Sequence, residues 1–284
     1  MRRTRIGLLT RTLGPFGTLA VLLALIASAC STASASAGTE APPSTRAAST
    51  TTTAAPTTTR APTTTVPEPT TTTTIPNPNE TLVAVANTSL ESLVVYDSPD
   101  GELFELPFRV PNPHQFGGPL TLMVTEGSRG DDWVKVQLPV RPNGQEAWIP
   151  AADYRIRSTV VRAEVDLSST SVRVFEDDQL IAETQAAIGS EETPTPLGTF
   201  FVAAKRRNPP AESYLGTWAL VLSGYSEALP SFSGGLPVIA IHGTNEPDRV
   251  LGKAVSNGCV RVPNEVIQFL AKNVPLGAPV TVTA

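Results

Sequence analysis

The chain has 284 residues, which is enough for two domains, and a formal net charge of −5. Four arginines and no acidic residue lie in its N-terminal segment, so the remainder carries 17 basic against 26 acidic residues. An acidic chain without a basic stripe is repelled by phosphate groups, which excludes nucleic acid as a partner and electrostatic binding to anionic lipid.

Cysteine and histidine are too scarce for a disulfide framework or a zinc centre. The two cysteines, Cys30 and Cys259, lie in a leader and in a C-terminal motif, so no disulfide framework is available. Zinc sites need three or four ligands, whereas the only histidines, His114 and His242, are far apart in sequence. We therefore expect neither a metal nor a cofactor.

Residues 1–30 have the pattern of a secretory signal peptide. Arginines up to Arg11 precede an apolar run that is too short and too interrupted by glycine and proline for a comfortable membrane span. The run ends in Leu-Ile-Ala-Ser-Ala-Cys, which resembles a lipobox with Ala27 where leucine is more usual. We expect export, with Cys30 lipidated on the outer face of the cytoplasmic membrane. Ordinary cleavage nearby, or an uncleaved anchor, remains an alternative, and membrane contact is expected only here.

Residues 31–80 are rich in Thr, Pro, Ala and Ser and have almost nothing to bury, which predicts a disordered linker. Prolines stiffen it towards polyproline II, so it could reach on the order of 150 Å, into the cell wall.

Residues 81–157 contain short apolar stretches separated by turn signals, which predicts a small β-barrel. The segments 133–136 and 146–149, joined through Pro142-Asn143-Gly144, resemble the last hairpin of a bacterial SH3-type domain. Trp133 and Trp148 are expected in its core, and wall binding by this module stays open. His114 is expected to be an exposed loop residue.

Residues 158–284 continue the alternating pattern and contain one clear helix. The helix is expected over 263–273, with Val266, Phe269 and Leu270 on its apolar side. The fold class is therefore mainly β with one helix. Residues 205–235 are rich in Pro, Gly and Ser and could form a lid over a site.

Two motifs of this second domain carry candidate chemistry: Ala-Ile-His-Gly-Thr at 240–244 and Ser-Asn-Gly-Cys-Val-Arg at 256–261. A thiol becomes a strong nucleophile as a thiolate, so Cys259 needs a base or cation that lowers its pKa, and His242 is the histidine placed to help. A strand ending in His242 and a returning turn at Cys259 would bring them together. Gly258 allows a tight turn whose amides can meet an oxyanion, and Arg261 could bind a carboxylate. Alternatively, Cys259 is a buried small hydrophobe and Arg261 a surface charge.

These motifs resemble the signature of the YkuD-type L,D-transpeptidases, and the resemblance extends over about 125 residues. Upstream segments agree in order with the family, including Ala-Ile-Gly at 187–189 and Thr-Pro-Leu-Gly-Thr-Phe at 195–200. The resemblance implies a β-sandwich catalytic domain with Cys259 as nucleophile and His242 as proton acceptor and donor. It also implies an oxyanion hole at Asn257, Gly258 and Cys259, and substrate contacts from Arg261, Gly243, Thr244 and Ser256.

One departure from the family concerns Asn257, which stands where many members have a second histidine. Asparagine cannot shuttle a proton, so the thiol would rely on His242 alone, oriented by a backbone carbonyl rather than by a carboxylate. We expect the reaction to survive this change.

The implied reaction is a two-step acyl transfer on peptidoglycan. Cys259 attacks the carbonyl of the third residue of a donor stem peptide and releases the terminal D-alanine. An acceptor stem amine then gives a 3,3 cross-link, and water gives an L,D-carboxypeptidase. β-Lactams of the carbapenem type are expected as covalent inhibitors, and the first domain is expected to limit which stems reach Cys259.

Two other readings stay open. A papain-like endopeptidase also uses cysteine and histidine, but there the cysteine precedes the histidine, in the reverse of the order seen here. A lipid-anchored wall-binding protein with an inactive domain would explain Asn257, but His242, Gly258, Cys259 and Arg261 are all intact.

Overall fold

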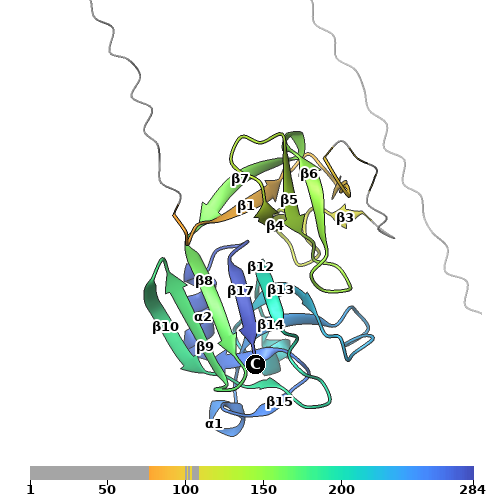
Figure 1. Ribbon diagram of the computed structural model, residues 1–284. Helices are drawn as coiled ribbons and strands as arrows, with labels where there is room; N and C mark the ends of the chain where they lie inside the picture. The colour runs from red at the N-terminus through yellow and green to blue at the C-terminus, as the bar shows by residue number, and fades with distance from the viewer. Residues whose placement is uncertain (1–76, 100, 102, 104–108) are drawn as a thin grey trace, which may run out of the picture. The chain divides into compact units, whose positions relative to one another are not determined.

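The computed structural model describes residues 77–284 except 100, 102 and 104–108 (Figure 1). The expected leader, Cys30 and nearly all of the expected linker lie outside these residues. Strands dominate the described part, as the fold class predicts. No helix within it is long and apolar enough to cross a membrane.

The N-terminal part is built on an antiparallel sheet of five strands, called here the first sheet, in the order β6-β5-β4-β1-β7. Its strands are β1 (Thr81–Ala86), β4 (Thr121–Glu126), β5 (Trp133–Gln137), β6 (Glu146–Pro150) and β7 (Tyr154–Thr159). A small pair of β2 (Ser92–Leu93) and β3 (Val110–Pro111) and a 3-10 turn η1 (Ala151–Asp153) complete it. The predicted hairpin is confirmed, because β5 pairs with β6 and Lys135 lies opposite Trp148.

The two tryptophans of this hairpin correct the expectation that they belong to the core. Val134, Val136, Ala147 and Ile149 are the buried residues of β5 and β6. Since side chains alternate along a strand, Trp133 and Trp148 lie on the opposite face, where both are half-buried. Trp133 packs edge-on against Tyr96 at 5.1 Å between ring centroids, and Lys135 lies over Trp148.

The C-terminal part is built on a mixed sheet of eight strands, called here the second sheet, in the order β10-β9-β8-β17-β12-β13-β14-β16. The strands are β8 (Val161–Asp166), β9 (Ser171–Glu176), β10 (Gln179–Gln185), β12 (Gly198–Arg207), β13 (Trp218–Tyr225), β14 (Val238–Thr244), β16 (Val260–Pro263) and β17 (Pro279–Thr283). A separate parallel pair joins β11 (Ile188–Gly189) to β15 (Ala254–Ser256). Strands from both ends of the sheet bury their side chains in one core, so the sheet folds over into a sandwich.

Helix α2 (Asn264–Asn273) forms where the sequence predicts it, and the short α1 (Pro247–Val250) and η2 (Pro210–Leu215) complete this part. Ile267 and Leu270 of α2 are buried in the core, with Val266 partly buried. Phe269 was expected on the apolar side, but 39% of it is exposed. The apolar stripe therefore runs through Ile267 instead, at helical spacing from Leu270.

Strand β12 belongs to the second sheet but contributes to two cores. Phe200 and Val202 point into the sandwich, whereas Phe201 and Ala203 are buried in the core of the first sheet. The period of two along a strand produces this division, because neighbouring side chains leave on opposite faces. Both faces of β12 are thus covered by apolar packing, and Phe201 is fully buried.

Polar side chains join the two sheets close to β12. The side-chain amide of Asn143 pairs with the backbone of Tyr225 as a neighbouring strand would. Its Nδ2 donates to Tyr225 O at 2.8 Å, and its Oδ1 accepts from Tyr225 N at 2.8 Å. Tyr225 in turn donates its hydroxyl to Pro139 O at 2.7 Å. Gln137 donates to Thr199 O and accepts from Ser223 Oγ. These bonds fix the first sheet against β12 and β13.

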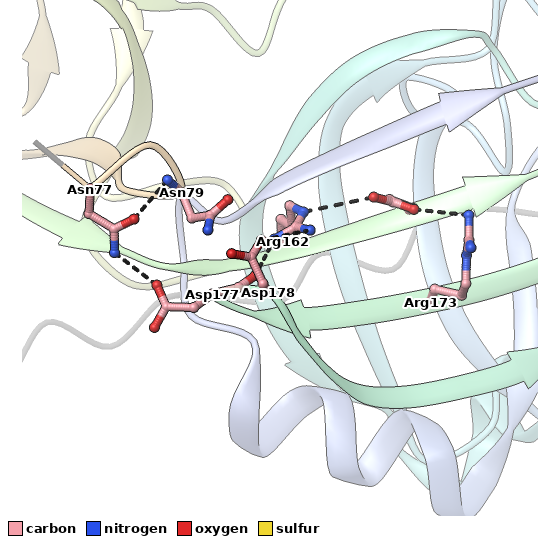
Figure 2. A network of polar contacts seen from close by, with 7 residues as sticks. Asn77, Asn79, Arg162, Arg173, Asp177 and Asp178 are labelled. Carbon is pink, nitrogen blue, oxygen red and sulfur yellow. Dashed lines mark hydrogen bonds and ion pairs between the residues drawn. The ribbon is translucent and has the colours of Figure 1, made fainter.

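A second, exposed polar network joins the start of the described chain to the β9–β10 turn (Figure 2). Asn77 donates to Asp177 Oδ1 at 2.8 Å and accepts from Asn79 N at 2.9 Å. Further along, Arg162 lies within 3.8 Å of Glu164, and Arg173 within 3.1 Å of the same carboxylate. Exposed pairs of this kind contribute little to stability.

The substitution Asn143→Ala is expected to destabilise the protein by about 2 to 4 kcal/mol. It removes two backbone-directed bonds and leaves the amide and carbonyl of buried Tyr225 without these partners. Urea unfolding followed by fluorescence measures the change. Asn77→Ala is the matched control, since it also loses two side-chain bonds but at an exposed position, and less than about 1 kcal/mol is expected. Equal losses in both variants would contradict a special role for Asn143.

Candidate active site

Two adjacent parallel strands bring the candidate base and nucleophile together. Strand β14 pairs with β16 so that Ile241 lies opposite Val260, and His242 lies opposite Arg261. Cys259 directly precedes β16, so it reaches the same sheet edge as His242 although 17 residues separate them in the sequence. Both side chains line one cavity. This is the strand-and-turn arrangement that the sequence analysis expects.

His242 is held in one tautomer by the backbone. Its Nδ1 lies 2.7 Å from Gly243 O, and this bond needs the ring proton on Nδ1, which leaves Nε2 without one in the neutral ring. The partner is a carbonyl rather than a carboxylate, in line with expectation. The side chain is only 3% exposed, and its pKa is lowered to about 4 by burial and by the charge of Arg261, against the carbonyls of Gly243 and Leu215.

The surroundings of Cys259 favour the neutral form of its thiol. Burial raises its pKa and outweighs the opposite effects of the Ala240 backbone and of Arg261. The sulfur lies 3.9 Å from Val238 O, which is a weak contact. The sequence argument expects a lowered thiol pKa, and this expectation is wrong. The lowered pKa of His242 and the raised pKa of Cys259 both favour the neutral forms of the two groups.

The turn before Cys259 depends on Gly258 and Ser256. Gly258 has a φ of +105°, as the tight-turn prediction requires, and a Cβ there would lie 2.9 Å from Ile239 Cδ1. The Gly258 amide donates to Ser256 Oγ at 3.1 Å, and Ser256 Oγ donates to Cys259 O. The Gly258 amide is therefore occupied, which corrects its expected place in the oxyanion hole. Within the described residues, the amides of Asn257 and Cys259 have no acceptor.

Gly243, Thr244 and Ser256, which were expected to contact substrate, do not line the cavity. Thr244 is buried and accepts from Glu246 N, while Ser256 is buried in the turn described above. Gly243 is buried against α2, where a Cβ would lie 2.2 Å from Asn264 Oδ1. All three are therefore buried in the structure around the site rather than in the wall of the cavity. Asn257, in contrast, is exposed beside a small hollow that Cys259 also lines.

Arg261 lies opposite His242 on the neighbouring strand and two residues after Cys259. Its positive charge lowers the pKa of both groups. Its backbone exchanges two hydrogen bonds of 2.8 Å with Ala187. Its Nε is buried and has no partner among the described residues. A buried donor without a partner suits an anion such as a carboxylate.

The sequence analysis missed several supporting residues. Thr193 Oγ1 and Ser190 N both donate to Ser256 O, which ties the segment after β11 to the nucleophile turn. Asn264 Oδ1 accepts from Thr217 N, and its Nδ2 donates to Thr244 O, so α2 holds the end of β14 against the residues after η2. Small polar residues of this kind give no periodic signal, so only their position in the fold reveals them.

The cavity has a volume of about 390 Å³ and is lined largely by apolar residues. Tyr214, Phe232 and Leu236 line it, and two of these come from the segment 205–235 that was expected to form a lid. Gln115 and Phe116, from the N-terminal part, line it as well, and neither was singled out from the sequence. Among the described residues, no group of three or more His, Cys, Asp or Glu is placed to hold a metal ion.

Comparison with known proteins shows what the C-terminal part is similar to. Residues 161–282 match the family model described as YkuD, L,D-transpeptidase catalytic domain. The YkuD protein of Bacillus licheniformis is 34% identical over 122 residues, or 43% of this chain and 65% of that protein. The YkuD protein of Bacillus subtilis is 31% identical over 118 residues, or 42% of this chain and 63% of that protein. The chain thus covers less than two thirds of either relative.

Among solved structures, an L,D-transpeptidase from Mycobacterium tuberculosis H37Rv is similar, with 17% identity and a TM-score of 0.38. The similarity covers 58% of this chain and 90% of that one.

Proposed function

Because residues 161–282 match the family model of the YkuD L,D-transpeptidase catalytic domain, we propose that the protein is a peptidoglycan L,D-transpeptidase with a cysteine nucleophile. The observation that carries the proposal is that His242, on β14, and Cys259, which directly precedes the adjacent strand β16, line one cavity. Exposed Asn257 takes no part in proton transfer.

In the first half-reaction, Cys259 Sγ attacks the carbonyl carbon of the third residue of a donor stem. The thiol proton passes to Nε2 of neutral His242, whose Nδ1 proton stays with the Gly243 carbonyl. The Cys259 amide, with that of Asn257, donates to the oxyanion. Collapse of the tetrahedral intermediate breaks the C–N bond, and the His242 proton leaves with the amine of D-alanine. A thioester on Cys259 remains.

In the second half-reaction, an acceptor amine attacks the thioester and gives a proton to His242. The C–S bond breaks and the thiol recovers a proton, which restores the neutral resting pair. The side-chain amine of another stem gives a 3,3 cross-link, and water gives the L,D-carboxypeptidase product. Arg261, with its unpartnered Nε, suits a carboxylate of the donor stem.

Localisation belongs to the same proposal. The leader pattern and the lipobox-like sequence before Cys30 favour export and lipid anchoring, and the Thr/Pro-rich linker would let the folded part reach the wall. The substrate class fits this location, since peptidoglycan lies outside the cytoplasmic membrane.

Intact-mass spectrometry of residues 77–284 tests the proposal. The wild type and Cys259→Ala are incubated with a carbapenem and, separately, with a disaccharide tetrapeptide. We expect a carbapenem adduct that requires Cys259, and loss of D-alanine from the tetrapeptide, with a dimeric product if transfer is to an amine. A folded wild type that forms no adduct and releases no D-alanine would refute the proposal and favour the inactive wall-binding alternative.

A further inference from the structure

Residues 112–118, here called the 112–118 loop, are held rigidly on the first sheet. Asn112 is buried, and its side chain donates to Asn87 O and Leu90 O and accepts from Leu120 N at 2.9 Å. Within the loop, His114 N donates to Gly118 O, and Gly117 N donates to His114 O at 2.7 Å. The loop therefore has a defined shape that the rest of the first sheet supports.

His114 fixes the direction of Phe116. It was expected to be exposed, but only 8% of it is, so that expectation is wrong. Its Nδ1 accepts from Phe116 N at 3.3 Å, and the centroids of the two rings lie 5.6 Å apart. The imidazole thus supports both the backbone and the side chain of Phe116.

The loop also rests against the catalytic domain. Residues of both sheets, including His114, Gln115, Tyr225 and Leu236, surround a small hollow of about 90 Å³ under the loop. Tyr225 and Pro139, which share a hydrogen bond, both line this hollow, and Asn143 bonds to the backbone of the same Tyr225. The first sheet is thereby placed with the loop facing the catalytic cavity.

Phe116 lines that cavity together with Cys259 and His242, and 38% of it is exposed. Tyr214, Phe232 and Leu236 line the same cavity and are also exposed. Exposed apolar side chains that gather at a concave site favour an apolar ligand group. Here they come from two separate parts of the chain.

We infer that Phe116 is a specificity-determining residue, which contacts the side chain of the donor residue whose carbonyl Cys259 attacks. That residue must lie in the cavity during attack, and an aliphatic side chain there can pack on the Phe116 ring. A diamino acid fits, because its methylene groups can cover the ring while its polar end stays in water. The inference rests on the proposed function, whose substrate it refines.

The test compares two synthetic tetrapeptide donors that differ only at the third position, a diamino acid in one and alanine in the other. D-Alanine release gives kcat and KM for the wild type, Phe116→Ala, Phe116→Leu and Phe269→Ala. Phe269 is the matched control, since it is a phenylalanine of 39% exposure that lines no described pocket of the site. Melting temperatures check the folding of each variant.

For the diamino acid donor, we expect Phe116→Ala to lower kcat/KM by about tenfold, mainly through KM, because the contact is made equally before and during attack. The alanine donor should change by less than about twofold. Phe116→Leu keeps an apolar contact and should lose only about two- to threefold, and it carries the test if the alanine variant does not fold. Phe269→Ala should match the wild type with both donors.

Two results would overturn the inference while the proposed function stands: equal losses for both donors, or no loss in either Phe116 variant. A wild type that releases D-alanine from neither donor would instead refute the proposed function itself.

Discussion

Replacement of His242 by glutamine is expected to slow the acylation of Cys259 by about a hundredfold to ten-thousandfold. The raised pKa of Cys259 favours the neutral thiol, so attack requires a base that takes its proton, and Nε2 of His242 is the proposed acceptor. Glutamine can still donate to the Gly243 carbonyl, but its amide is not a base at neutral pH. Timed intact-mass measurement of the carbapenem adduct gives the rate. A loss below tenfold in a folded variant would remove His242 from the mechanism.

The pH dependence of the same reaction shows whether Cys259 and His242 start as a neutral thiol and imidazole or as a thiolate and imidazolium. Burial lowers the His242 pKa to about 4, and only the unprotonated ring can act as base. On the acid side, kcat/KM is therefore expected to hold through pH 5 and to fall only as the pH approaches about 4. An ordinary histidine would give the fall near about 6.5. His114→Gln should keep this acid limb unchanged, and circular dichroism at each pH confirms that the fold persists.

The substitution Gly243→Ala is expected to destabilise the protein by about 3 kcal/mol or more, since buried overpacking against fixed groups is costly. The new Cβ would lie 2.2 Å from Asn264 Oδ1, 3.0 Å from Ile267 Cγ2 and 3.1 Å from Gly216 Cα. The peptide that holds Nδ1 of His242 would have to move, so activity should fall with stability. Thermal unfolding and D-alanine release measure the two effects.

Two further variants control this result. Gly235→Ala adds a Cβ whose nearest neighbour lies 3.8 Å away, so its melting temperature should stay close to that of the wild type. Adding Asn264→Gly to Gly243→Ala removes the closest clash, so the double variant should lose less stability than the sum of the two single substitutions. A Gly243→Ala protein as stable as the wild type would show that the helix can shift to make room.

Local sequence signals predicted much of the fold because they act over short distances. Alternating apolar residues and the Pro-Asn-Gly turn indicated the β5–β6 hairpin, and helical spacing indicated α2. The face of α2 was less certain, because Phe269 and Ile267 are both apolar and only the packing of the core decides between them. The same limit explains Trp133 and Trp148, whose outward face depends on which side of the hairpin is buried.

For the candidate site, the sequence predicted which residues take part but not their burial, pKa values or hydrogen bonds. The two motifs identified His242 and Cys259, but the pKa values depend on burial, which no motif records. Occupation of the Gly258 amide by Ser256 Oγ depends on a turn geometry that many sequences can satisfy. Phe116 could not be found at all, because 126 residues separate it from His242 and only the contact between the sheets brings it to the cavity.

The two-sided burial of β12 limits how this protein could have been assembled during evolution. A gene segment for the catalytic domain alone would encode Phe201 and Ala203, whose side chains fit the core of a neighbour that the segment does not include. Transfer of the domain without a partner that covers this face of β12 would expose them and favour aggregation. A recombination event that keeps the protein soluble must therefore move both sheets together, or be accompanied by polar replacements at Phe201 and Ala203 of β12.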